Sequence, residues 1–185
     1  MKKLTFLVGL MVVAMGLFTT NVFAQDTNEA GETVTYTLPA MAILDVEGTA
    51  PTLTFAAPAE AGDAVADVTS NGSWINYTSI IASGSTNKVT AEISAGSVPT
   101  STTLKVVAAA DASAGDGTVG TPAAQITLSG TAQDLITGIG SCYTGDGSSA
   151  GHNLTYTWSV DADGYASVAT ANASLTVTYT ITASL

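Results

Sequence analysis

The sequence predicts an all-β protein, an antiparallel two-sheet β-sandwich of about eight to ten strands. Three observations support this fold class. Apolar and hydroxyl-bearing side chains alternate with a period of two along several segments, as in strands that bury one face. Clusters of Gly, Ser, Asn and Asp, which favour turns, separate these segments at short intervals. After residue 24, almost no segment shows the apolar spacing of an amphipathic helix.

The first residues have the three parts of a secretory signal peptide. Lys2 and Lys3 precede an apolar run over 4–18, and small residues end at Ala24. We expect cleavage between Ala24 and Gln25, then a polar N-terminal extension over 25–32 and a single β-sandwich domain over 33–185. The mature chain is then secreted, periplasmic or held at the cell surface, and it has no membrane span after cleavage.

Four segments predict strands most clearly: 33–38 (TVTYTL), 88–93 (KVTAEI), 153–160 (NLTYTWSV) and 175–181 (LTVTYTI). Each places Val, Ile, Leu, Ala or aromatic side chains on one face and mostly Thr or Ser on the other, except that Lys88 and Glu92 share the polar face of 88–93. Weaker patterns predict strands at 42–46, 52–56, 64–69, 73–82, 102–109 and 124–129. Turn-forming residues cluster at 71–73, 83–87, 114–122, 144–151 and 161–164.

The segment 175–181 is expected to be an integral strand, with its threonines towards solvent. Its four apolar side chains, at about 1.5–3 kcal/mol each when buried, contribute as much as the net stability of a whole domain. The pattern of 153–160 likewise places Trp158 in the core, on the face of Leu154 and Tyr156.

Charge excludes one class of partner. Loss of Lys2 and Lys3 leaves two lysines and no arginine against fifteen acidic residues, a formal charge of −13. Because a nucleic-acid site needs several cations to neutralise phosphates, we expect no nucleic-acid partner.

The residues that carry most enzyme chemistry are scarce. Cys142 and His152 are the only cysteine and histidine, which is too few for a zinc site, and no cation lies near Cys142 in the sequence to activate its thiol. We expect Cys142 to be buried, with an intermolecular disulfide or a reactive thiol as the alternatives. His152 is expected to lie in a surface loop. Asp161 and Asp163 predict a turn and leave calcium binding open. The chain is expected to be no enzyme and to hold no cofactor or metal.

The end of the chain supports a resemblance. A signal peptide, an acidic β domain rich in Thr, Ala and Gly, and the final strand SLTVTYTIT resemble secreted fimbrial subunits, the spore-coat-U-like and archaic chaperone–usher pilins. The resemblance implies an incomplete immunoglobulin-like sandwich that a strand of the next subunit completes. Such pilins usually carry a cysteine pair, whereas Cys142 is single. Because residues 25–32 are polar, the donor would be 33–44, which the pattern equally predicts as the first internal strand.

These observations predict a secreted non-enzymatic structural or surface-interaction protein, a fimbrial or pilin-like subunit in its sharper form. Its partners would be copies of itself or other surface proteins. The alternative is an extracytoplasmic binding module for a glycan or a cell-surface partner. Trp74, Tyr77 and Tyr143 are then the candidate partner-binding residues, and we expect Trp74 and Tyr77 to lie on opposite faces of one strand.

Overall fold

The computed structural model describes residue 29 and residues 31–184. The chain divides into two compact units, Met1–Thr37 and Leu38–Leu185. In the first unit, the described residues form no strand or helix. The predicted cleavage site between Ala24 and Gln25 lies outside the described residues.

The described part of the second unit is almost entirely β. Its elements are β1 (Met41–Gly48), β2 (Val68–Ile80), β3 (Asn87–Ala95), β4 (Thr102–Asp111), β5 (Asp116–Gly117), β6 (Thr121–Pro122), β7 (Ile126–Thr127), β8 (Gln133–Ile139), β9 (Cys142–Tyr143), β10 (His152–Val160), the short 3-10 helix η1 (Tyr165–Ser167) and β11 (Thr176–Ala183). Within residues 29 and 31–184, no helix has the length and apolarity to cross a membrane.

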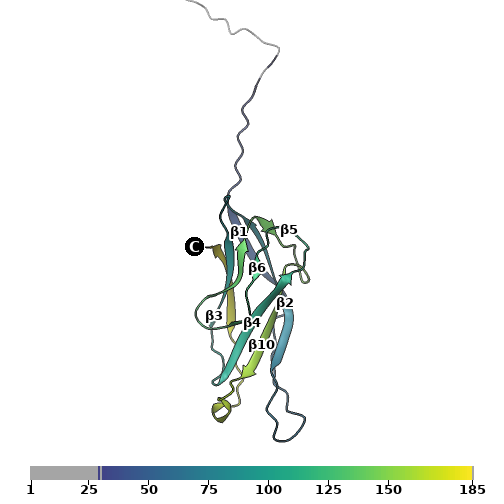
Figure 1. Cartoon of the computed structure of the whole chain (residues 1–185), viewed down its shortest axis with the longest axis vertical. Coiled ribbons are helices and arrows are strands. Elements are labelled where there is room, and N and C mark those ends of the chain that lie inside the picture. The colour runs from purple at the N-terminus through teal and green to yellow at the C-terminus, as the bar shows by residue number, and fades with distance from the viewer. Residues whose placement is uncertain (1–28, 30, 185) are drawn as a thin grey trace, which may run out of the picture. The chain divides into compact units, whose positions relative to one another are not determined.

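Two antiparallel sheets face each other, which confirms the predicted β-sandwich (Figure 1). The first sheet has the order β5-β9-β2-β10-β4-β7, and β1 also pairs with β2. The second has the order β11-β3-β8-β6. Every strand pair in the described chain is antiparallel.

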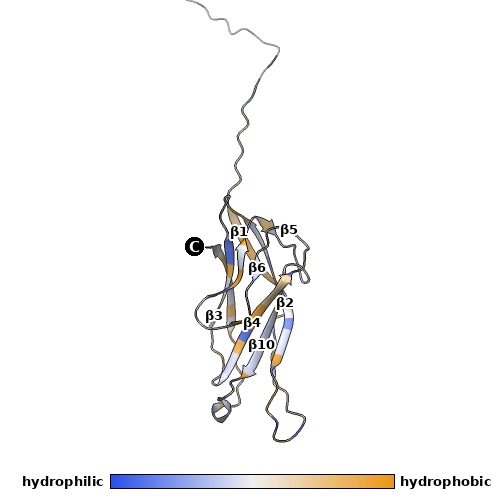
Figure 2. Cartoon of the chain, in the orientation of Figure 1, coloured by the Kyte–Doolittle hydropathy of each residue, from blue (hydrophilic) through white to orange (hydrophobic). Residues whose placement is uncertain are grey.

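The core lies between the sheets. Apolar and polar positions follow one another along most of the longer strands (Figure 2), so these strands turn one face inward. In β2 the inward side chains include Ile75 and Tyr77, and β10 contributes Leu154 and Tyr156. The buried residues of this core are Ile75, Tyr77, Val89, Ala91, Leu104, Val106, Ala108, Leu128, Leu135, Ile136, Ile139, Cys142, Leu154 and Tyr156.

Most of the predicted strands are present. β3, β10 and β11 contain the segments 88–93, 153–160 and most of 175–181, and the apolar side chains of 175–181 pack against the core as predicted. Trp158 is half-buried, packs against the core and has its ring centroid 4.2 Å from that of Phe55.

Other predictions were wrong. Residues 33–38 and 52–56 form no strand, and only Ile126–Thr127 of 124–129 does. The predicted turn at 71–73 lies inside β2. A glycine is favoured at position 72 because the backbone that leaves β1 passes close to it. Thr49 N–H donates to the Gly72 carbonyl at 2.9 Å, and a Cβ on Gly72 would lie 3.2 Å from the Thr49 carbonyl oxygen. The glycine therefore reports a close approach of backbones rather than a turn.

Candidate interaction surface

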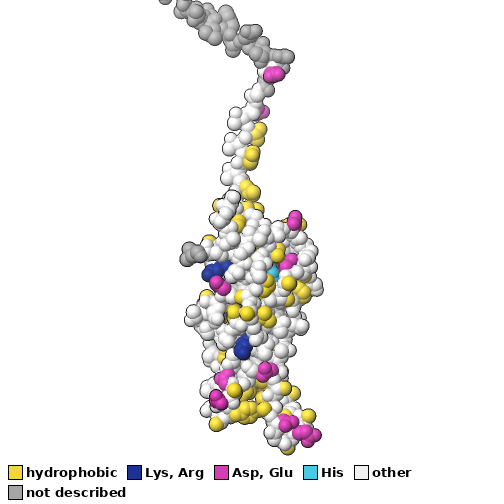
Figure 3. Space-filling view, in the orientation of Figure 1, with side chains coloured by type: hydrophobic (Ala, Val, Ile, Leu, Met, Phe, Trp, Pro, Cys, Tyr) yellow, Lys and Arg dark blue, Asp and Glu magenta, His cyan; other side chains and the backbone are white. Residues whose placement is uncertain are grey.

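The segment 33–38 exposes an alternating apolar face. Val34 is 77% exposed, Tyr36 is 91% exposed and Leu38 is 71% exposed. Figure 3 shows a row of hydrophobic side chains along this part of the chain. Thr35 and Thr37, which alternate with them, are also exposed. The segment therefore has the pattern of a half-buried strand without a partner in the described chain.

β11 is an edge strand of the second sheet. It is hydrogen-bonded along one side only, to β3, with Val177 opposite Ile93, Tyr179 opposite Ala91 and Ile181 opposite Val89. Its apolar face packs against the core, and no strand among the described residues pairs with its outer side. Main-chain groups on that side can accept another strand.

A pair of tyrosine hydroxyls joins β11 to the opposite sheet. The hydroxyl of Tyr179 is hydrogen-bonded to that of Tyr156 in β10. Burial raises the pKa of both phenols above their ordinary value, and for Tyr179 the neighbouring Tyr156 raises it further. Both groups are therefore uncharged at neutral pH, and their contact holds β11 against the core.

β1 is the neighbouring edge of the first sheet and lies against β11. Leu44 faces inward opposite Tyr77, and Val46, two residues on, shares that face opposite Ile75. Even so, Val46 is 44% exposed. The flank of the sandwich between β1 and β11 is thus only partly covered.

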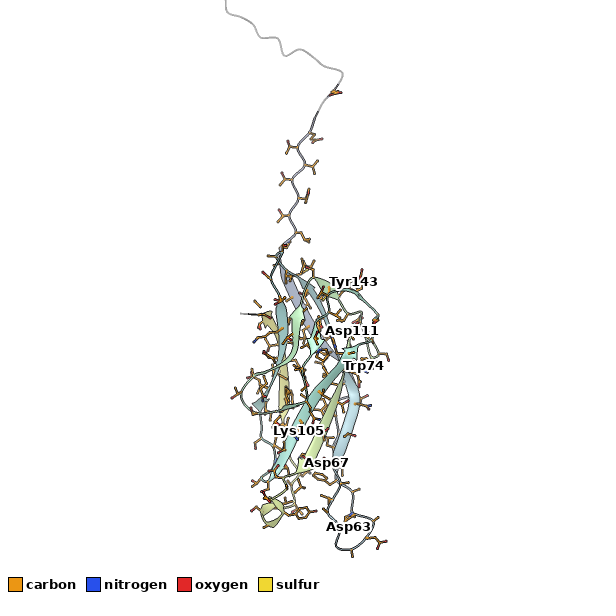
Figure 4. The ribbon with its side chains drawn as sticks, in the orientation of Figure 1. Asp63, Asp67, Trp74, Lys105, Asp111 and Tyr143 are labelled. Atoms are coloured by element: carbon orange, nitrogen blue, oxygen red, sulfur yellow. The ribbon has the colours of Figure 1, made fainter. Side chains whose placement is uncertain are left out.

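The three predicted partner-binding aromatics are separated by the fold. Trp74 is half-buried on the outward face of β2, whereas Tyr77 is buried in the core, so the two lie on opposite faces as expected. Burial leaves the ring of Tyr77 with no surface for a ligand. Tyr143 is 53% exposed and lies at the end of the sandwich that Asp111 also occupies, with Trp74 further along (Figure 4). Of these three aromatics, only Tyr143 is exposed enough to offer its ring to a partner.

His152 is fully buried, so its prediction as a surface loop residue was wrong. It begins β10, and its Nδ1 lies 2.8 Å from the carbonyl oxygen of Ala109, which can only accept a hydrogen bond. Its Nε2 lies 2.8 Å from the hydroxyl of Tyr77, which also contacts the carbonyl oxygen of Val119. Nδ1 therefore donates to the Ala109 carbonyl, and both ring nitrogens are held by contacts in the core.

Cys142 is buried with a free thiol, as predicted. Burial raises the pKa of the thiol, and the negative charge of Asp111 raises it further, while a hydrogen bond with the backbone of Ser79 lowers it. The thiol is therefore protonated at neutral pH and shielded from reagents. This environment is the opposite of the one that activates a nucleophilic cysteine.

Acidic groups gather in no metal-binding cluster within residues 29 and 31–184. Asp161 accepts a hydrogen bond from the Thr103 hydroxyl at 2.5 Å, and its carbonyl accepts the Gly164 N–H at 2.9 Å, which closes the predicted turn. A shallow depression at the end of the sandwich opposite Tyr143 is lined mainly by alanines, with Asp63 and Asp67 (Figure 4).

The basic groups of the described chain are few and separate. Lys88 Nζ lies 2.9 Å from Asp134 Oδ1 in a partly exposed ion pair. Figure 3 shows the lysines apart from each other among acidic side chains.

Comparison of the chain with models of protein families, with curated proteins and with solved structures found no match.

Proposed function

We propose that the mature chain is a secreted, non-enzymatic structural or surface-interaction protein, a pilin-like subunit that joins other copies by strand addition. The observation that carries the proposal is the exposed alternating face of Val34, Tyr36 and Leu38. Such a face is an efficient template for pairing, and proteins normally cover it or interrupt it with charge or proline. Here the three side chains are 71–91% exposed and the threonines between them carry no charge, so a partner strand is the natural cover.

The β-sandwich itself is consistent with a structural role. Its sheets are closed by a continuous apolar core, and its single histidine and cysteine are enclosed in that core rather than presented in a cleft. Exposed acidic residues keep copies soluble before assembly. Export through the predicted signal peptide would bring the subunit to the cell surface or the periplasm.

Light scattering coupled to size-exclusion chromatography tests the proposal on the chain that begins at Gln25. We expect multimers that grow with protein concentration. Tyr36→Asp places a charge on the apolar face and should leave monomers. Thr35→Asp, the matched control, places the same charge on the other face and should still assemble. A wild-type chain that stays monomeric at every concentration would refute the proposal, as would equal assembly of the two variants.

The alternative function, a binding module for a glycan or a cell-surface partner, has one supporting observation, the 53% exposure of Tyr143. An exposed ring can stack on a sugar face. Screening on a glycan array would favour this function if binding appeared and Tyr143→Ala removed it, while Tyr36→Asp left it unchanged.

A further inference from the structure

Residues 33–38 and 176–181 are nearly the same hexapeptide. The first is TVTYTL and the second TVTYTI, so only Leu38 and Ile181 differ. The second copy forms most of β11, with its valine, tyrosine and isoleucine packed against the core. The first copy exposes the matching valine, tyrosine and leucine. One pattern therefore occurs twice, once folded into the sheet and once without a partner.

The edges of the two sheets differ in how well they are protected. β5, β6 and β7 are two residues long, and β6 contains Pro122. β1 is longer but carries Asp45 and Glu47. β11 spans eight residues with no charge and no proline. Short length, charge and proline are the features that stop an edge from pairing, and β11 lacks all three.

We infer that segment 33–38 of one copy adds to the free edge of β11 in a second copy, as an antiparallel strand. The inference rests on the proposed function and names its acceptor. Antiparallel addition agrees with every strand pair in the described sandwich. Because apolar side chains must share the inward face, only registers that differ by two residues are allowed. Of these, we take the one in which all three apolar residues of the segment lie opposite Val177, Tyr179 and Ile181.

In this register Val34 lies opposite Ile181, Tyr36 opposite Tyr179, and Leu38 opposite Val177. The threonines then form a ladder on the outer face, with Thr35 opposite Thr180. Both strands are uncharged, so their approach brings no like charges together in a strongly acidic protein. The added apolar side chains reach the flank where Val46 of β1 is 44% exposed.

Donor and acceptor are different surfaces of the same chain. Such a contact is heterologous, and each copy that accepts a strand still offers its own segment 33–38 to the next. Repeated addition then extends an open chain of subunits, whereas reciprocal exchange between two copies would give a closed dimer and ring closure a single larger size. Sedimentation should show a ladder of sizes without a dominant dimer.

Disulfide trapping between separate copies tests the register. One chain carries Thr35→Cys, and a second chain, distinguished by a size tag, carries Thr180→Cys or Thr178→Cys. Opposed Cβ atoms in a sheet lie about 5 Å apart and diagonal ones about 7–8 Å, whereas a disulfide needs about 4 Å. We expect the hybrid of Thr35→Cys with Thr180→Cys to form several-fold faster than the hybrid with Thr178→Cys. The wild-type chain, with buried Cys142, should form no dimer under the same oxidation.

The outcomes separate this inference from the proposed function. If wild-type copies form multimers but neither hybrid is trapped, the acceptor is another surface and the inference fails alone. Faster trapping with Thr178→Cys would mean parallel pairing or an antiparallel register displaced by two residues, and either would overturn the stated register. A diluted Thr35→Cys/Thr180→Cys chain that links within itself would show docking in the same copy. If the wild-type chain forms no multimers at all, the proposed function fails as well.

Discussion

The hydroxyl pair of Tyr156 and Tyr179 allows a quantitative test of whether β11 is part of the core. The pair spans the interior, with Tyr156 on β10 of one sheet and Tyr179 on β11 of the other. Tyr156 is only 5% exposed. Replacing either tyrosine by phenylalanine removes its hydroxyl and leaves the other hydroxyl in the interior without its partner. An unsatisfied buried polar group lowers the free energy of unfolding by about 1–3 kcal/mol.

The double variant behaves differently, because it removes both hydroxyls and leaves no orphan. We expect Tyr156→Phe and Tyr179→Phe each to lower the free energy of unfolding by about 1–3 kcal/mol, and the double variant to lose no more than one single variant. The coupling energy in this double-mutant cycle is then at least as large as the loss of one single variant, about 1–3 kcal/mol. Tyr143→Phe removes an exposed hydroxyl and should change stability by less than about 0.5 kcal/mol.

Urea unfolding followed by tryptophan fluorescence measures these energies. Trp158 lies against Phe55 in the folded protein, so its emission should change when the sandwich opens. Near-neutral single variants with additive effects would refute the reasoning, since they would mean that water satisfies both hydroxyls. That result would also show that β11 does not hold its place in the core.

Four further expectations concern pH, reactivity, backbone and charge. Burial raises the pKa of Tyr179 and Cys142, so these groups lose their protons at lower pH in the unfolded chain than in the folded one. The urea midpoint should therefore hold constant below about pH 8 and fall above about pH 9. A midpoint that stays constant to about pH 11 would contradict this. Cys142 should react with a thiol reagent only after denaturation, and rapid native labelling would show that it is accessible. Gly151→Ala places a Cβ 2.3 Å from the Ile75 carbonyl oxygen and should destabilise the fold more than Gly147→Ala, which has open space around it; equal losses would leave only backbone strain as the cause. The mature chain should not bind a heparin column even at low salt, and retention would contradict the charge argument.

The fold class was predictable because it depends on local patterns that repeat along the chain. The strand β8 was missed because its pattern is not regular: Leu135 and Ile136 are adjacent and both fully buried. The pairing of β3 with β8 shifts register near Val89, which lets two successive side chains turn inward. No period-two rule can find such a strand without its partner.

The candidate surface also depends on partners that the local sequence does not reveal. The hexapeptides at 33–38 and 176–181 have almost the same letters, yet one forms a strand and the other does not. Only the presence of β3 beside the second distinguishes them. His152 was also beyond prediction, because a histidine is buried only when the fold supplies partners, and Ala109 and Tyr77 lie far from it in the sequence.

The pairing of β11 with β3 also has a consequence for the time course of folding. Thr178 and Ser94, which touch across this pair, are 84 residues apart in the chain. Contacts at such separation form late, since a long loop must close before they are made. During that interval we expect the edge of β3 to be vacant, so that segment 33–38, which has nearly the sequence of β11, can compete for it. The yield of correctly closed subunits should therefore fall as refolding concentration rises, because intermolecular capture accelerates with concentration while closure by β11 does not.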